Sequence, residues 1–104
     1  MTLDDLYATI EARKHADPDT SWTARLLNSG PEKCAEKFGE EAVEAIIEAV
    51  RNDRKALTAE AADVLFHLLV MLASRNVTLR EVMAELEQRQ NHSGIEEKRS
   101  RSDG

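Results

Sequence analysis

The sequence predicts an all-α protein, and three observations lead to this prediction. Glu, Ala, Leu and Arg, which all favour helix, are the most abundant residues of the 104-residue chain. Gly and Pro, which interrupt helices, number only four and two. Apolar residues recur three and four positions apart, and no segment alternates as a half-buried strand would. We expect one domain over residues 1–90, folded as a four-helix bundle, and a polar tail over residues 91–104.

The first helix is expected to begin after Thr2, which can cap it together with Asp5, and to end near Lys14. Its apolar residues have helical spacing: Leu3, Leu6, Tyr7 and Ile10. The following loop, "HADPDTSWT", contains Pro18 and several residues typical of caps. The segment "WTARLL" after it predicts a short turn of helix.

Two long helices follow. Pro31 in "NSGPEK" suits a first helical position, so the second helix is expected from about Pro31 to about Arg51. Asn52 or Asp53 then caps a third helix that spans roughly Arg54–Ser74. The fourth helix is expected after Thr78 and Glu81, which form a capping-box pattern. It carries apolar residues at helical spacing: Leu79, Val82, Met83 and Leu86.

Charge and cysteine content exclude several classes of protein. The net charge of −6 argues against a general nucleic-acid binder. A single cysteine, Cys34, cannot form an internal disulfide or a cysteine-based zinc site. No signal peptide opens the chain, and no apolar run reaches the ~18 residues of a membrane span. We expect a soluble cytoplasmic protein that contacts neither nucleic acid nor membrane.

An unusual set of glutamates marks the second helix, in the stretch "EKFGEEAVEAIIEAV". On a helical wheel they fall within a wedge about 100° wide. Like charges four residues apart destabilise a helix by roughly 0.2–0.5 kcal/mol per pair, so another interaction should offset the repulsion. The four residues are Glu40, Glu41, Glu44 and Glu48.

The third helix is apolar on nearly every side except for one polar stripe. Glu60, Asp63 and His67 share this stripe, so we expect Asp63 to be buried. A buried carboxylate is costly unless it is paired or bound to metal. His67 is expected to be a hydrogen-bonded core residue rather than a metal ligand.

Glu41-x-x-Glu44 and Glu60-x-x-Asp63 lie on consecutive helices that can pack antiparallel, which would place the two carboxylate pairs face to face. A site that offers carboxylate oxygens and no cysteine suits a hard cation, Mg²⁺ or Mn²⁺. An alternative is that the glutamates of the second helix form a solvated face. In that case Lys37 would pair with Glu41, and Arg51 with Glu48.

Other side chains near these acids suit a phosphorylated ligand. Lys33 and Lys37 precede the glutamates on the same helix face and can hold a phosphate, or can act only as ion-pair partners. Trp22, between Ser21 and Thr23, can stack on a base or cover the core.

Three stretches make the chain similar to the phosphoribosyl-ATP pyrophosphohydrolase family: "SWTARLLNSGPEKCAEKFGEEAVEAIIEA", "EAADVLFHLLVMLA" and "SGIEEKRSR". This family belongs to the broader all-α nucleotide pyrophosphatases of MazG type. The resemblance implies that Glu41, Glu44, Glu60 and Asp63 bind Mg²⁺, with Glu40 as an additional acid of the site. It also implies that Lys33 and Lys37 lie near the substrate phosphates.

The resemblance implies Mg²⁺-dependent hydrolysis of phosphoribosyl-ATP to phosphoribosyl-AMP and pyrophosphate, the second step of histidine biosynthesis. Glu40 or Glu44 would accept a proton from the attacking water, and Ser21, Trp22 and Thr23 would contact the substrate. Because the third helix is too apolar to be covered by three neighbours, a homodimer is expected, through the third and fourth helices. The alternatives are a house-cleaning nucleoside triphosphate pyrophosphatase of the same fold, or a non-enzymatic dimerising bundle.

Overall fold

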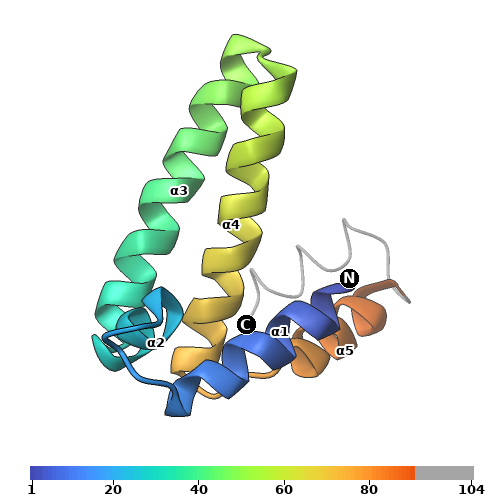
Figure 1. Cartoon of the computed structure of the whole chain (residues 1–104). Coiled ribbons are helices and arrows are strands. Elements are labelled where there is room, and N and C mark those ends of the chain that lie inside the picture. The colour runs from blue at the N-terminus through green and yellow to red at the C-terminus, as the bar shows by residue number, and fades with distance from the viewer. Residues whose placement is uncertain (91–104) are drawn as a thin grey trace.

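The computed structural model describes residues 1–90, so the predicted polar tail over 91–104 lies outside the described residues. Every described element is helical, as the composition predicts (Figure 1). In chain order the elements are α1 (Leu3–Ala12), a 3₁₀ turn η1 (Arg13–His15), α2 (Trp22–Asn28), α3 (Pro31–Arg51), α4 (Arg54–Ser74) and α5 (Leu79–Gln90).

The long hairpin of α3 and α4 dominates the molecule (Figure 1). Gly30 has a φ of 96°, which only glycine adopts readily, and Pro31 follows it at the start of α3. At the other end Asn52 is in the left-handed conformation, and the Asp53 side chain accepts a hydrogen bond from the Ala56 N–H at 3.0 Å. These residues reverse the chain within two positions, so α4 returns antiparallel to α3 along its full length.

The apolar core lies at the open end of this hairpin, where α1 and α2 pack against α4. Cys34 on α3 is buried there, and its thiol donates to the Leu26 carbonyl of α2 at 3.3 Å. Burial raises the pKa of this thiol. The thiol is thus packed in the core, as expected of a small apolar residue. The core cluster consists of Tyr7, Ile10, Leu26, Cys34, Leu69, Val70, Ala73 and Leu79.

Two interactions of high sequence separation fasten α1 to the end of α4. The Tyr7 hydroxyl donates to the Val77 carbonyl at 2.6 Å, and burial raises the Tyr7 pKa. Lys14 donates to Asn76 Oδ1 at 2.9 Å and forms an ion pair with Glu11 at 3.1 Å. The start of the chain is therefore held at the base of the hairpin.

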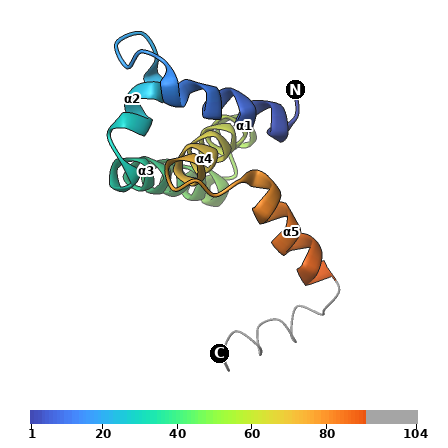
Figure 2. The same ribbon diagram turned by 90° about the horizontal axis from the view of Figure 1, so that it is seen from below.

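Helix α5 begins at the predicted capping box. The Glu81 N–H donates to Thr78 Oγ1 at 3.0 Å, and the Thr78 N–H donates to Glu81 Oε1 at 3.1 Å. Beyond the buried Leu79, α5 runs away from the hairpin (Figure 2). Met83 and Leu86 are exposed on it, so α5 does not close a compact four-helix bundle within one described chain.

Much of the hairpin is apolar and uncovered. A compact domain of this size has a radius of gyration of about 13 Å, against 15.9 Å here. By length and composition alone, helix α4 is long and apolar enough to cross a membrane, a feature that was not expected from the sequence. Helices at the centre of soluble bundles share this property, and α4 carries carboxylates in its middle. The exposed apolar residues of the hairpin are Val43, Ile46, Ile47, Val50 and Leu65.

The predicted helix boundaries agree closely with the structure. Both long helices begin and end at the expected residues, and the first helix continues into η1 near Lys14. The sequence predicted too short a length for α2, which is a separate helix of seven residues and not a single turn. The described residues therefore form five α-helices where four were expected.

Candidate metal and nucleotide site

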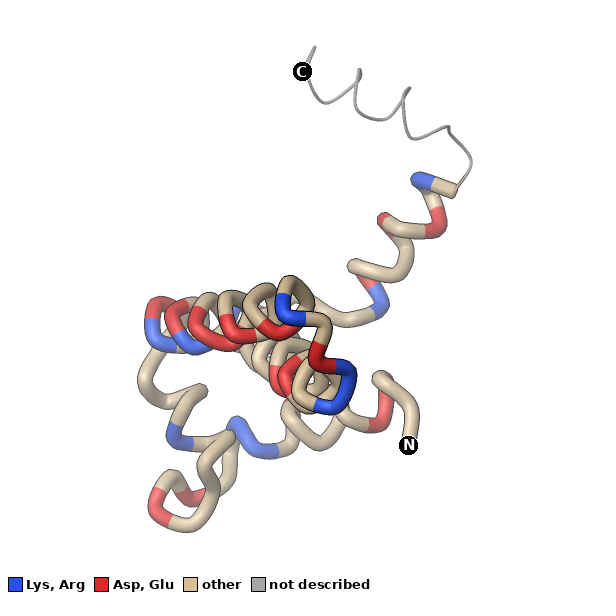
Figure 3. Tube along the Cα trace, turned by 90° about the horizontal axis from the view of Figure 1, so that it is seen from above, with Lys and Arg blue, Asp and Glu red and all other residues tan. Residues whose placement is uncertain are grey.

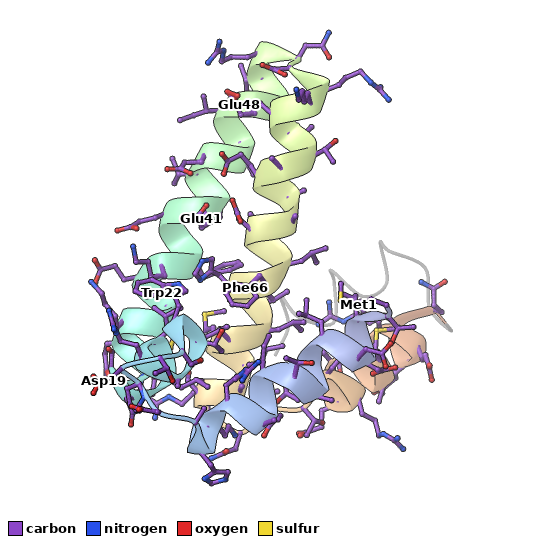
Figure 4. All side chains as sticks on the ribbon, in the orientation of Figure 1. Met1, Asp19, Trp22, Glu41, Glu48 and Phe66 are labelled. Carbon is purple, nitrogen blue, oxygen red and sulfur yellow. The ribbon has the colours of Figure 1, made fainter. Side chains whose placement is uncertain are left out.

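Part of the acidic face of α3 points into the hairpin, toward α4: Glu41 and Glu48 are partly buried, whereas Glu40 and Glu44 are exposed. Asp and Glu positions recur along α3 (Figure 3), and Glu41 and Glu48 lie between the two helices (Figure 4). Glu48 is mostly buried and accepts a bond from Arg51 at 3.3 Å, the ion pair expected under the alternative of a solvated glutamate face. Because Glu48 has this partner, the unexplained repulsion concerns the acids deeper in the hairpin.

The antiparallel hairpin brings together carboxylates that are distant in sequence. Glu41 of α3 meets Glu60 and Asp63 of α4, and ligand oxygens of the three residues lie within 4.8 Å of one another. Glu44, one turn after Glu41, lies against Glu60 as well. Three of the four carboxylates that the sequence predicts to face each other therefore converge, whereas Glu44 is exposed and stands outside this group, next to Glu60.

Glu60 shows most clearly the energetic cost of bringing these carboxylates together. Its pKa is raised by burial first, then by hydrogen bonding and charge repulsion from Glu44, and also by the charges of Glu41 and Asp63. Glu60 Oε2 is buried and has no hydrogen-bond donor among the described residues, although Glu44 lies beside the carboxyl group. A buried acceptor without a donor is costly, so the site lacks a positive group.

A divalent cation would supply the positive charge that this site lacks. The surrounding donors are carboxylate oxygens, which Mg²⁺ and Mn²⁺ prefer over nitrogen or sulfur. Glu41, Glu44, Glu60 and Asp63 come from two rigid helices, so a cation between them would join the two arms of the hairpin. The unsatisfied Glu60 oxygen is the observation that favours this fit.

The expected burial of Asp63 is wrong for the single chain. Asp63 is exposed, although the apolar character of its helix predicts burial. Asp63 nevertheless contacts the acidic cluster through its position one turn after Glu60. Its contribution is therefore an accessible negative charge and not a buried one.

Glu40 and the two lysines flank the cluster on α3. Lys37 is half-buried and lies 3.4 Å from Glu40, whereas the more exposed Lys33 lies 3.5 Å from Glu36. Lys37 therefore pairs with Glu40 and not with Glu41, so Glu41 remains free to face Glu60. Both pairs are long and solvent-accessible, and pairs of this kind add only ~0.3–0.5 kcal/mol to stability.

The three substrate-binding candidates of α2 lie beside the open end of the acidic face. The Ser21 hydroxyl caps α2 by accepting a bond from the Ala24 N–H at 3.1 Å, so its oxygen has a structural role. Thr23 is half-buried. Trp22 is 53% exposed, so much of its side chain is open to solvent. Figure 4 shows Trp22 and Phe66 below Glu41, toward the base of the hairpin.

His67 differs from the sequence expectation in one respect. It is buried, as predicted, but no hydrogen bond to either ring nitrogen is formed by a described residue. Its ring makes an edge contact with Phe66, with the centroids 5.1 Å apart. Sequence reasoning treated His67 as a satisfied core residue. The available signal to the contrary was the helical stripe that it shares with Glu60 and Asp63.

Comparisons with known proteins identify relatives of this chain. Residues 3–90 match the family described as phosphoribosyl-ATP pyrophosphohydrolase. The chain is 73% identical over 101 residues to the phosphoribosyl-ATP pyrophosphatase of Roseobacter denitrificans, covering 97% of this chain and 96% of that protein. Proteins of the same name from Cereibacter sphaeroides and Dinoroseobacter shibae are each 75% identical. These two matches cover 95% and 92% of this chain, and 96% and 94% of the respective relatives.

Proposed function

The chain belongs to the phosphoribosyl-ATP pyrophosphohydrolase family, and on this basis we propose that it hydrolyses phosphoribosyl-ATP to phosphoribosyl-AMP and pyrophosphate. This is the second step of histidine biosynthesis. The observation that best supports the proposal is the meeting of Glu41, Glu60 and Asp63 across the hairpin. A fold could leave these acids in water, but here they converge, as binding of a divalent cation that bridges to the substrate phosphates requires.

Glu41, Glu44, Glu60 and Asp63 hold the divalent cation in this proposal, with Mg²⁺ preferred and Mn²⁺ accepted. When bound, such a cation neutralises phosphate charge and lowers the pKa of a coordinated water. Glu44 belongs to this set because it already lies against Glu60. The carboxylates also fix the position of the phosphates relative to the rest of the site.

Glu40 is the proposed proton acceptor. It lies outside the converging carboxylates, one turn before Glu44, and only its Oε2 contacts Lys37, so its Oε1 remains available to the attacking water. Water adds across the α–β anhydride, its oxygen ends on one phosphoryl group, and the bridging oxygen leaves with the other. The proton released by the water passes to Glu40.

Lys33 and Lys37 are proposed to bind the phosphates of the leaving pyrophosphate. Negative charge accumulates there as the anhydride bond breaks, and a cation that binds it more strongly in the transition state increases the rate. The half-buried position of Lys37 supports the stronger role, because shielding from water strengthens an ionic interaction. The long distances to Glu36 and Glu40 mean that neither lysine is tightly held by its own helix.

The working molecule is proposed to be a cytoplasmic homodimer whose ligand is a small nucleotide and not a nucleic acid or a membrane. The exposed residues Val43, Ile46, Ile47 and Val50 have helical spacing and form one apolar stripe along α3. Together with Leu65 of α4 this stripe suits packing against a second hairpin, which would complete a four-helix bundle. Helix α3 is thereby added to the expected contact through α4 and α5.

A direct assay tests the proposed function. Pyrophosphate release is measured with phosphoribosyl-ATP and, in parallel, with ATP and the deoxynucleoside triphosphates, with Mg²⁺ or with EDTA. We expect Mg²⁺-dependent release of one pyrophosphate from phosphoribosyl-ATP, at a kcat/KM far above that for free triphosphates. Preference for a free triphosphate would favour the house-cleaning alternative. No hydrolysis and no Mg²⁺ binding by calorimetry would favour a non-enzymatic bundle.

A further inference from the structure

Among the described residues, Glu60 and His67 are the two with a buried side-chain polar atom that lacks a hydrogen-bond partner. The cation proposed above would explain Glu60, but it leaves His67 unexplained. His67 is 8% exposed, and its Nδ1 is sealed from solvent. A buried polar atom without a partner is costly and is rarely retained in a core without a reason.

The two ring nitrogens of His67 have different surroundings. Nδ1 is sealed and unpartnered, whereas Nε2 is neither hydrogen-bonded to a described residue nor sealed, so it keeps contact with solvent. A neutral imidazole has one N–H donor and one lone pair. Because buried N–H groups without an acceptor are rarer than under-satisfied acceptors, the proton belongs on Nε2. His67 therefore presents an N–H donor at the accessible edge of its ring.

The position of this donor relates it to the acidic cluster. On the wheel of α4, His67 falls between Glu60 and Asp63, and it lies about 6 Å along the axis from Asp63. Since Glu44 meets Glu60 in the antiparallel register, the same register places Lys37 level with His67. Helix α2 packs against both α3 and α4, and Figure 4 shows Trp22 and Phe66 toward the base of the hairpin. The donor is thus on the side of the cluster that faces α2.

We propose that His67 donates its Nε2–H to an uncharged acceptor in the nucleoside part of the bound substrate. This inference rests on the proposed function, because it takes the acidic cluster as the site of the phosphates. A neutral donor beside the aromatic ring of Phe66 suits a base or ribose oxygen or nitrogen, whereas the phosphates have the lysines and the cation. The half-exposed Trp22 then provides a surface on which the base stacks.

Nuclear magnetic resonance of the full chain at pH 8 tests the tautomer and the contact directly. We expect the ¹⁵N shifts of His67 to report the Nε2–H form, and Nε2 to shift on saturation with AMP and Mg²⁺. Pyrophosphate with Mg²⁺ should leave Nε2 unchanged. A shift with AMP but not with ribose 5-phosphate assigns the base as acceptor, and a shift with both assigns the ribose. The Nδ1–H form, no saturable AMP binding, or equal shifts with pyrophosphate would overturn the proposal.

Variants separate this contact from a role in packing. In His67→Gln the amide nitrogen lies near the position of Nε2, so the KM for phosphoribosyl-ATP should stay within about threefold of wild type. In His67→Leu the donor is lost, and we expect KM and the inhibition constant of AMP to rise about tenfold, with kcat little changed. The inhibition constant of pyrophosphate should not change. Val70→Ala, a change at a neighbouring buried position of α4, provides the control for general loosening of the core.

The outcomes distinguish this inference from the proposed function. If Val70→Ala raises the AMP inhibition constant as much as His67→Leu at equal loss of stability in urea, His67 acts only through packing. If wild type, His67→Gln and His67→Leu hydrolyse phosphoribosyl-ATP with the same KM, the inference fails and the proposed function stands. If wild type does not hydrolyse phosphoribosyl-ATP, the proposed function fails, and the AMP titration still decides the role of His67.

Discussion

Single residues of the acidic cluster show a conflict that folding alone does not resolve. Glu60 has a raised pKa and an unsatisfied buried oxygen, and its neighbours are other carboxylates. By contrast, Glu48 at the end of the same row is paired with Arg51. The sequence could have neutralised Glu60 in the same way. Among the described residues, no positively charged group lies between the acids around Glu60. A cation site requires such a set of carboxylates that no side chain neutralises.

The raised pKa of Glu60 sets the pH dependence of the metal-free protein. The folded state holds the Glu60 proton more strongly than the unfolded state does, so this residue contributes stability at low pH. That contribution is lost as pH rises from the ordinary glutamate value through the raised one. We expect Glu60→Gln to weaken this pH dependence in thermal melts without metal. Mg²⁺ at pH 7 should raise the melting temperature of wild type and barely change that of the variant.

Asp63→Asn should abolish turnover while the helical fold is retained. Asp63 is exposed and adds repulsion to the cluster, so the metal-free variant should be as stable as wild type or more stable. The measurements are pyrophosphate release and urea unfolding monitored by circular dichroism. A strong loss of stability in the metal-free variant would show that Asp63 has a structural partner instead.

Substitution of Glu44 and of Glu40 should have different effects. Glu44→Gln removes a proposed ligand and should weaken Mg²⁺ binding by at least ~10-fold, the size of loss found even for partners of ligands. Glu40→Gln should leave Mg²⁺ affinity unchanged and lower kcat by ~10²-fold or more, as loss of a proton acceptor does. Calorimetry with Mg²⁺ and steady-state kinetics separate the two. Equal Mg²⁺ affinity in wild type and Glu44→Gln would remove Glu44 from the ligand set.

Lys37→Met should change stability little, because its contact with Glu40 is long and exposed. As a clamp on the leaving phosphates, however, Lys37 should matter greatly to the rate. We expect kcat/KM to fall at least ~100-fold, about 2.7 kcal/mol of transition-state stabilisation. Lys33→Met should act in the same direction. If kcat/KM of both variants at saturating Mg²⁺ stays near that of wild type, the two lysines are only surface charges.

At the scale of helices, the sequence predicts most of the structure because local signals mark the ends. Pro31 and Asp53 begin the two long helices, and Thr78 with Glu81 begins α5, all as expected. The length of α2 was underestimated because its cap, Ser21, stands in a loop rich in similar residues. The register that joins Glu41 to Glu60 and Asp63 also follows from the short turn and could be predicted.

What the sequence did not predict concerns which side of a helix is covered. An apolar helix such as α4 is expected to be buried all round, so Asp63 was expected to be buried too. In one chain, however, α3, α1 and α2 cover only part of α4. The stripe that His67 shares with Glu60 and Asp63 marks it as unusual, but no pattern of residue types reports whether a hydrogen-bond partner reaches its ring. Both features depend on packing between segments that are distant in sequence.

At the scale of the whole molecule, the apolar stripe of α3 leads to a prediction about assembly. Wild type is expected to sediment as a dimer, because an exposed row of large apolar residues is costly in water. Ile46→Glu places a charge at 62% exposure in the centre of this row and should shift sedimentation toward the monomer. Ala8→Glu, an exposed position on α1, is the control and should leave the dimer intact. A wild-type monomer at micromolar concentration would contradict the proposal.

The bond between Tyr7 and Val77 has a kinetic consequence. It joins positions 70 residues apart, whereas α3 and α4 are joined by a two-residue turn and can associate early in folding. Contacts that close long loops tend to form after local ones, so this bond should be absent from the transition state. Tyr7→Phe would then leave the refolding rate nearly unchanged and accelerate unfolding in stopped-flow measurements. The hydroxyl of Tyr7 would thus determine how long a folded molecule lasts, rather than how quickly it forms.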